Sequence, residues 1–271
     1  MASSLASAAI REFELTLDEI DSSVRFAALA SKLRPRLSPV VNREYLHGDL
    51  EQLVKAFTEF KDVNTAHLCR GLIVVISGAF EKLVRRIVEE SVIHINSSAP
   101  KFDELSQSIR VQNIFFTGRA LCSFKEPPDH LSIDTQKLSA QLASCNLGAS
   151  TFTLNAEAFA MFITNLTPAH LSEVFRSIGI TLDWDYFGRI KTFEAMFGTK
   201  GPRATGTAAS NKLGELIRIR NRISHTGENS SGVDENTVNS YVAFFRIFSP
   251  NLIDLVEAKL PKVKPIGPKK S

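Results

Sequence analysis

Residues 64–95 read NTAHLCRGLIVVISGAFEKLVRRIVEESVIHI and form the longest apolar helical pattern in the chain. Its middle, from Leu72 to Phe80, is apolar on nearly every side of a helix, whereas its C-terminal half has an apolar face and a charged face that includes Arg85 and Glu89. A helix that is apolar all round is normally central and covered on several sides. The stretch therefore predicts a long, buried helix that packs against other helices.

Other segments have the period expected of covering helices. The first repeats apolar residues at steps of three and four: Ile10, Phe13, Leu17, Ile20, Val24 and Ala27. Further helices are predicted at 50–60, 156–164, 168–178, 184–197, 211–225 and 233–259. We expect Thr167, Asp183 and Asp234 to cap helices, and Pro250 to kink or shorten the last one. Strand signals are weak everywhere, so the sequence predicts an all-α protein.

The order of these segments predicts one helical domain over residues 1–260, with an insertion at about 101–200. The insertion is expected to hold shorter helices, with a break at Pro127-Pro128. Residues 198–206 are glycine-rich and are expected to form a flexible loop between helices. The loop is a near miss for a phosphate-binding loop, because no Lys-Ser/Thr pair follows and no strand precedes it. Residues 261–271 are predicted to be a disordered basic tail.

The composition excludes several classes of protein. Of the 271 residues, 44% are hydrophobic, which excludes a chain disordered over its whole length. The three cysteines, Cys69, Cys122 and Cys145, have no metal-site spacing and are expected to be buried in a reducing compartment. We expect neither a metal nor a cofactor. No secretory signal and no membrane-spanning run is found, so we expect a soluble, cytoplasmic chain with no membrane partner.

The stretch that carries chemistry is residues 216–227, LIRIRNRISHTG. On a helix, Asn221 and His225 stack on one face, because they are four residues apart, and Arg220 and Ser224 form the adjacent stripe. One helix end therefore groups an Arg, an Asn, a Ser and a His.

Charge is concentrated in the same region. The whole chain carries only +3, whereas residues 200–222 hold six basic residues against the single acid Glu215, a local charge of +5. A near-neutral chain with one concentrated basic region suits local contact with a polyanion better than a surface that coats the polyanion. The candidate contact residues are Lys200, Arg203, Arg218 and Arg222.

The spacing Arg220-Asn221-x-x-x-His225 at the end of a long helix resembles the R-x(4–6)-H signature of the HEPN superfamily. Residues 70–81, RGLIVVISGAFE, resemble the apolar helix of larger prokaryotic HEPN proteins, in which a small residue precedes an acidic one. The likeness is greatest to the RiboL-PSP and MAE-type groups. It implies an antiparallel helical bundle with inserted helices and with core motif helices at 64–95 and 208–226.

The resemblance also implies a function. Many HEPN proteins are metal-independent endoribonucleases that dimerise around a shared RNA cleft, and several act in toxin–antitoxin or phage-defence systems. Carried over, His225 and Arg220 are the catalytic residues, and Asn221 and Glu81 support them. Ser224 is a further supporting residue by its place on the helix. With RNA as the partner, Lys200, Arg203, Arg218 and Arg222 are the candidate RNA-binding residues. HEPN toxins paired with a nucleotidyltransferase antitoxin often carry a Tyr two residues after the His, which this chain lacks. The resemblance still implies an antitoxin or a defence-system protein as a partner.

Alternatives remain open at this stage. His225 can be a residue that only caps the last carbonyls of its helix, and Asn221 can serve to orient His225. For Glu81 we favour an ion pair with Arg220 across the bundle, and the alternative is Arg85 on its own helix. Arg70 is a further candidate for that cluster. The alternative function is a non-catalytic HEPN module that binds RNA or a nucleotide or scaffolds a partner protein. A helical domain that binds only proteins is the third.

Overall fold

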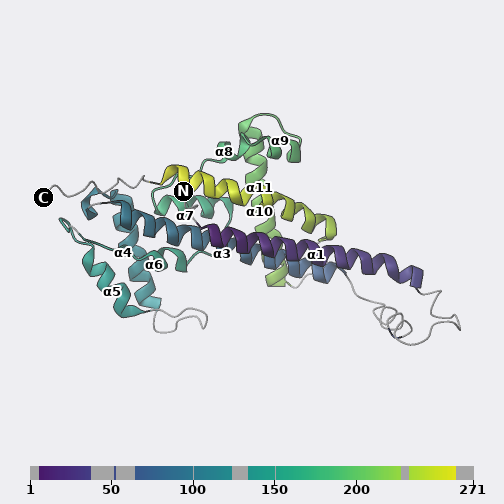
Figure 1. Ribbon diagram of the computed structural model, residues 1–271, viewed down its shortest axis with the longest axis horizontal. Helices are drawn as coiled ribbons and strands as arrows, with labels where there is room; N and C mark the ends of the chain where they lie inside the picture. Colours follow the sequence, from purple (N-terminus) through teal and green to yellow (C-terminus); the bar gives the residue numbers. More distant parts are fainter. Residues whose placement is uncertain are drawn as a thin grey trace. The chain divides into compact units, whose positions relative to one another are not determined.

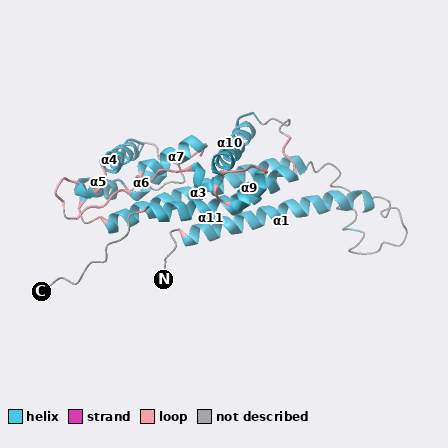
Figure 2. Ribbon diagram, turned by 90° about the horizontal axis from the view of Figure 1, so that it is seen from above, coloured by secondary structure: helices cyan, strands magenta, loops and turns pink. Residues whose placement is uncertain are grey.

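The computed structural model describes residues 6–37, 52, 65–99, 101–123, 134–149, 151–226 and 232–260. Within these ranges the chain forms α-helices and one short 3-10 helix, and no strand (Figures 1 and 2), which confirms the all-α prediction. The elements are α1 (Ser7–Leu37), α3 (Thr65–Ser98), η1 (Phe102–Glu104), α4 (Gln107–Cys122), α5 (Thr135–Ser144), α6 (Ala156–Met161), α7 (Pro168–Ser177), α8 (Trp184–Gly188), α9 (Lys191–Phe197), α10 (Pro202–Thr226) and α11 (Glu235–Lys259).

Some predicted features fall outside the described residues: the helix at 50–60, the Pro127-Pro128 break and the 261–271 tail. None of the described helices is both long and apolar enough to cross a membrane. By its internal contacts the chain divides into two compact units. Unit 1 comprises Met1–Arg11, Phe80–Gly214 and Ile247–Ser271, and unit 2 comprises Glu12–Ala79 and Glu215–Arg246. The expected domain boundary, 1–260 with an insertion at 101–200, stays a prediction.

Unit 2 is held together by the apolar faces of its helices. The predicted face of α1 is buried at Phe13, Leu17, Ile20, Val24 and Ala27. The Phe13 ring meets the Phe245 ring of α11 edge-on, with 5.7 Å between centroids. Arg246 and Asp18 form an ion pair between the same two helices, with 2.6 Å between nitrogen and oxygen. The periodicity of the first segment therefore identified a genuine packing face.

Unit 1 has an aromatic core against the C-terminal half of α3. Phe80 of α3 contacts Phe248 of α11 at 5.9 Å between ring centroids, and Phe187 of α8 stacks on Phe248 at 4.6 Å. Beside this core, α4 packs against α5, α6 and α7. A buried amide fixes that packing, because Asn155 donates hydrogen bonds to the Thr117 hydroxyl and the Leu138 carbonyl.

The helix caps follow the sequence rules. The side chains of Thr167, Asp183 and Asp234 accept hydrogen bonds from backbone N–H groups in the first turns of α7, α8 and α11, which confirms all three predicted caps. Pro250 does not end α11, which runs through it to Lys259. One expectation about the cysteines is wrong: Cys69 is buried, but Cys145 is only half-buried and Cys122 is exposed.

The region from 184 to 206 differs from the prediction. The single helix expected at 184–197 is two helices, α8 and α9, and the loop expected at 198–206 ends early, because α10 begins at Pro202. Proline suits this position, since the first helical N–H has no partner within the helix. Gly206 lies inside α10, where a Cβ atom would stand 2.3 Å from the carbonyl oxygen of Trp184. The glycine therefore permits a close backbone approach and does not mark a loop.

We expect Gly206→Ala to lower the free energy of unfolding by about 1–3 kcal/mol, because the added methyl overlaps backbone that cannot move away freely. Gly118→Ala in α4 is the matched control, since a Cβ there has nothing within 4 Å, and it is expected to raise stability by about 0.5–1 kcal/mol. Urea unfolding followed by Trp184 fluorescence, from the only tryptophan, measures both. Equal stability of the two variants would contradict the close approach.

Candidate functional site

The C-terminal part of α10 presents the predicted Arg/His motif. Its apolar side is anchored by Leu216 and Ile217, which are fully buried in unit 2, and Ile223 is half-buried nearly two turns later. The polar residues of the motif lie on the remaining sides of the same turns, because residues three and four apart share a face. The amphipathic pattern of α10 thus fixes which side chains reach solvent.

Arg220 is held by its neighbour. One terminal nitrogen of its guanidinium donates a hydrogen bond to the side-chain oxygen of Asn221 at 3.1 Å, and both residues are half-buried. Among the described residues, no carboxylate lies within ion-pair distance of Arg220. An amide anchor leaves the arginine charge uncompensated, so the guanidinium can meet a phosphate. Arg220 is therefore one partner of Asn221, and a role of Asn221 in orienting His225 stays a prediction.

His225 and Ser224 are exposed in the last turn of α10, which ends at Thr226. An exposed imidazole can reach a substrate from solvent, and imidazole both accepts and donates protons near neutral pH. The roles assigned to these residues stay predictions.

Arg218 and Arg222 line a shallow cavity of about 280 Å³ together with Glu215 of α10 and Val233 and Thr237 near the start of α11. The structure thus brings two of the four predicted RNA-binding residues to one hollow. Lys200 precedes α10 and Arg203 lies in its first turn, and both are exposed.

The sequence did not single out the pair Glu215 and Tyr241. Tyr241 is fully buried in unit 2. Its burial, followed by the nearby Glu215 carboxylate, raises the pKa of the Tyr241 phenol well above its ordinary value. The Tyr241 phenol therefore stays neutral. No sequence signal identifies this pair, because the two residues are 26 positions apart on different helices.

Glu81 is buried in α3, at 6% exposure, and its partners lie in unit 1. One carboxylate oxygen accepts a hydrogen bond from the backbone N–H of Asn165 at 2.6 Å, and the other lies 3.8 Å from Arg85. The ion pair that the structure shows for Glu81 is with Arg85, the alternative and not the favoured partner. Arg85 also donates to the carbonyl oxygen of Ile163 at 2.8 Å. Together the two side chains fix residues 163–165, between α6 and α7. Arg70 is buried and contacts His67 at 2.6 Å.

Across the described ranges, no group of three or more His, Cys, Asp or Glu side chains is arranged to hold a metal ion. The family model of RiboL-PSP-HEPN matches residues 44–258, which is most of the chain. The chain belongs to the RiboL-PSP-HEPN family. This confirms the HEPN assignment made from the two sequence motifs, and the helical architecture agrees with it. No curated protein and no solved structure matches this HEPN chain.

We expect Glu81→Ala to lower the free energy of unfolding by about 1–3 kcal/mol, because it leaves the Asn165 N–H without its acceptor. Glu81→Gln keeps an oxygen at the same place and is expected to lose less. Glu89→Ala is the control, since Glu89 pairs with Arg86 at the surface, and such pairs contribute about 0–1 kcal/mol. Chemical unfolding measures the free energy of unfolding of the three variants. If Glu81→Ala is as stable as Glu89→Ala, Glu81 does not hold the segment around Asn165 in place.

Proposed function

We propose that the chain is a metal-independent endoribonuclease in which Arg220 and His225 act on RNA. The observation that carries the proposal is the end of α10, where Arg220 is anchored by the Asn221 amide and His225 is exposed five residues later. The chain belongs to a HEPN family, and many HEPN proteins are ribonucleases, which supports the same proposal. Ser224, Arg218, Arg222, Lys200 and Arg203 are then candidates for additional RNA contacts.

The proposed reaction is cleavage by the RNA's own 2′-hydroxyl. The 2′-oxygen gives its proton to a base and attacks the adjacent phosphorus, the bond from phosphorus to the 5′-oxygen breaks, and that oxygen takes a proton. The products are a 2′,3′-cyclic phosphate and a 5′-hydroxyl. An imidazole can serve as base or acid, and a guanidinium can hold two phosphate oxygens while negative charge develops on them.

One His per chain supplies either the base or the acid at a given moment. We therefore propose a homodimer whose two motifs face one shared cleft, which would provide two His225 and two Arg220 side chains. We place this ribonuclease in the cytoplasm, in a toxin–antitoxin or phage-defence setting, where an antitoxin or a defence protein would control it. The non-catalytic alternative keeps RNA binding but predicts no cleavage.

We expect His225→Ala and Arg220→Ala each to reduce RNA cleavage by about 100- to 10,000-fold, because each removes a group that acts in the transition state. His94→Ala on α3 is the matched control and is expected to cleave at the wild-type rate. Mixed RNA is incubated with each variant in EDTA, and the new ends are tested for cyclic phosphate. Equal cutting by His225→Ala and wild type, or loss of cutting in EDTA, would refute the mechanism. RNA binding without cutting by wild type would favour the non-catalytic module.

We expect a dimer in solution, measured as the molar mass across a range of protein concentrations by light scattering. The cleavage rate per chain should rise over the range in which dimers form, because a monomer holds only half of the proposed cleft. Full activity of a chain that is monomeric at the assay concentration would refute the shared cleft while leaving the roles of Arg220 and His225 in place.

A further inference from the structure

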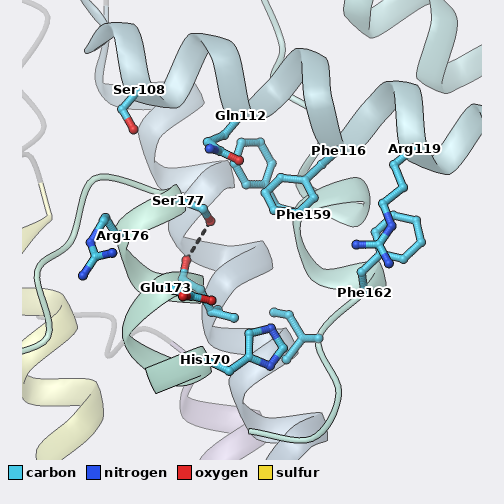
Figure 3. A pocket seen from close by; sticks show the side chains of 12 residues that line it. Ser108, Gln112, Phe116, Arg119, Phe159, Phe162, His170, Glu173, Arg176 and Ser177 are labelled. Atoms are coloured by element: carbon cyan, nitrogen blue, oxygen red, sulfur yellow. Dashed lines mark hydrogen bonds between the residues drawn. The ribbon is translucent and has the colours of Figure 1, made fainter. Parts of the chain in front are cut away.

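A cavity of about 310 Å³ opens in unit 1 between α4, the end of α6 and α7 (Figure 3). Three phenylalanine rings line it: Phe116, Phe159 and Phe162. Its polar lining comes mainly from α4 and α7, and Figure 3 shows Arg119 and Phe162 at one side and Ser108 at the opposite side. Cavities of a few hundred cubic ångströms with an apolar body and a few polar groups are typical of small-ligand sites.

The aromatic wall is fixed in place before any ligand arrives. Phe159 is 2% exposed, and its ring lies 5.3 Å from that of Phe116 at a tilt of 48°. Phe116 and Phe162 pack in turn on a small buried cluster: Ala120, Leu138 and Ala158. A planar ring that enters the cavity therefore meets preformed aromatic faces and edges, which favour stacked or edge-on contacts.

Arg119 offers an anion site on this wall. Its guanidinium carbon lies 3.9 Å from the centroid of the Phe162 ring, so the planar group is stacked on an aromatic face. Within the described part of the chain, Arg119 has no carboxylate partner. A stacked guanidinium keeps its N–H edge for a phosphate or carboxylate, which it can hold through two parallel hydrogen bonds.

His170 adds a second group suited to an anion. It lies in the first turn of α7, at the positive end of that helix, and its Nδ1 is 3.4 Å from the carbonyl oxygen of Asn165. That carbonyl belongs to the segment held by Glu81 and Arg85 of α3, so the contact fixes the position of the His170 imidazole. Among the described lining residues Glu173 is the one acid, against Arg119 and Arg176, and the cavity carries a net positive charge.

Two further lining groups can distinguish a ligand that carries a heterocyclic base from other anionic ligands. Gln112 of α4 and Glu173 of α7 form no side-chain hydrogen bond or ion pair with the described residues. A Gln amide both donates and accepts, and a carboxylate accepts from N–H groups. These groups can form hydrogen bonds with the ring nitrogens and amino groups of a heterocyclic base. A phenyl ring or an acyl chain offers them no hydrogen-bond partner.

We propose that this cavity binds a nucleotide. The base lies against Phe116 and Phe159, Gln112 and Glu173 read its edge, and Arg119 with His170 holds its phosphate. A free mononucleotide and an unstacked nucleotide of an RNA strand share this chemistry, since unpaired bases stack on aromatic and arginine planes in the same way. The proposal goes beyond the ribonuclease activity of α10 and does not rest on it, because none of these lining residues belongs to the Arg220/His225 motif.

Calorimetry on the full chain carrying His225→Ala tests the proposal with the four ribonucleoside 5′-monophosphates. At least one is expected to bind, and Arg119→Gln should weaken it by about tenfold or more, since it removes a charged hydrogen-bond donor. Arg189→Gln makes the same charge change at an exposed residue outside the cavity and should bind as the parent does. Gln112→Leu should weaken binding and narrow the differences between bases. Phenyl phosphate, which has a ring and a phosphate but no heterocycle, should bind at least about tenfold more weakly.

A short single-stranded oligoribonucleotide, titrated into the same variants, separates the two sources. Arg119-dependent binding of monophosphates identifies a free nucleotide, and Arg119-dependent binding of the oligonucleotide alone identifies a nucleotide within RNA. The proposal is overturned if neither probe depends on Arg119, or if phenyl phosphate binds as tightly as the best nucleotide. Cleavage by the chain with intact His225 is assayed separately, so failure of the ribonuclease proposal would leave the binding result unaffected.

Discussion

The burial of α3 is the constraint on which the other elements depend. Ile73, Ile76, Phe80 and Val84 are fully buried, and each such side chain stabilises the fold by about 1.5–3 kcal/mol relative to exposure. Leu68 and Val75 leave one face of α3 exposed, and its remaining faces need cover from several elements. The apolar face of α1 is buried in unit 2, and the aromatic cluster of α8 and α11 meets Phe80 in unit 1.

The same burial gives Glu81 its role. A carboxylate inside a packed helix must be paired or hydrogen-bonded, because an unpaired buried charge is costly. The Asn165 N–H and the Arg85 guanidinium satisfy it, and both lie within unit 1. The acidic residue of the HEPN-like motif thereby fixes the segment between α6 and α7. That segment carries Ile163, a wall of the aromatic cavity, and it supports His170.

Local rules were enough to predict α3, the buried face of α1 and the caps at Thr167, Asp183 and Asp234, because each depends on neighbours within one or two turns. The start of α10 was not predictable in this way. Gly206 has the composition of a loop, and only the carbonyl of Trp184 at its side explains why a glycine stands inside a helix. The motif residues of α10 were found from their spacing. The cavity was not, since His170 has no partner nearby in sequence and Phe116 and Phe159 belong to different helices.

The partners of the arginines separate structural positions from candidate binding positions. Arg85, Arg86 and Arg246 each pair with a carboxylate, so their charge is already balanced by the fold. Arg220 is held by an amide oxygen and Arg119 by an aromatic ring, neither of which carries a charge. A guanidinium oriented by a neutral group keeps both its fixed direction and its attraction for an anion. The spacing of the Arg/His motif identified Arg220, whereas no local pattern identifies Arg119, because the ring that orients it lies 43 positions away.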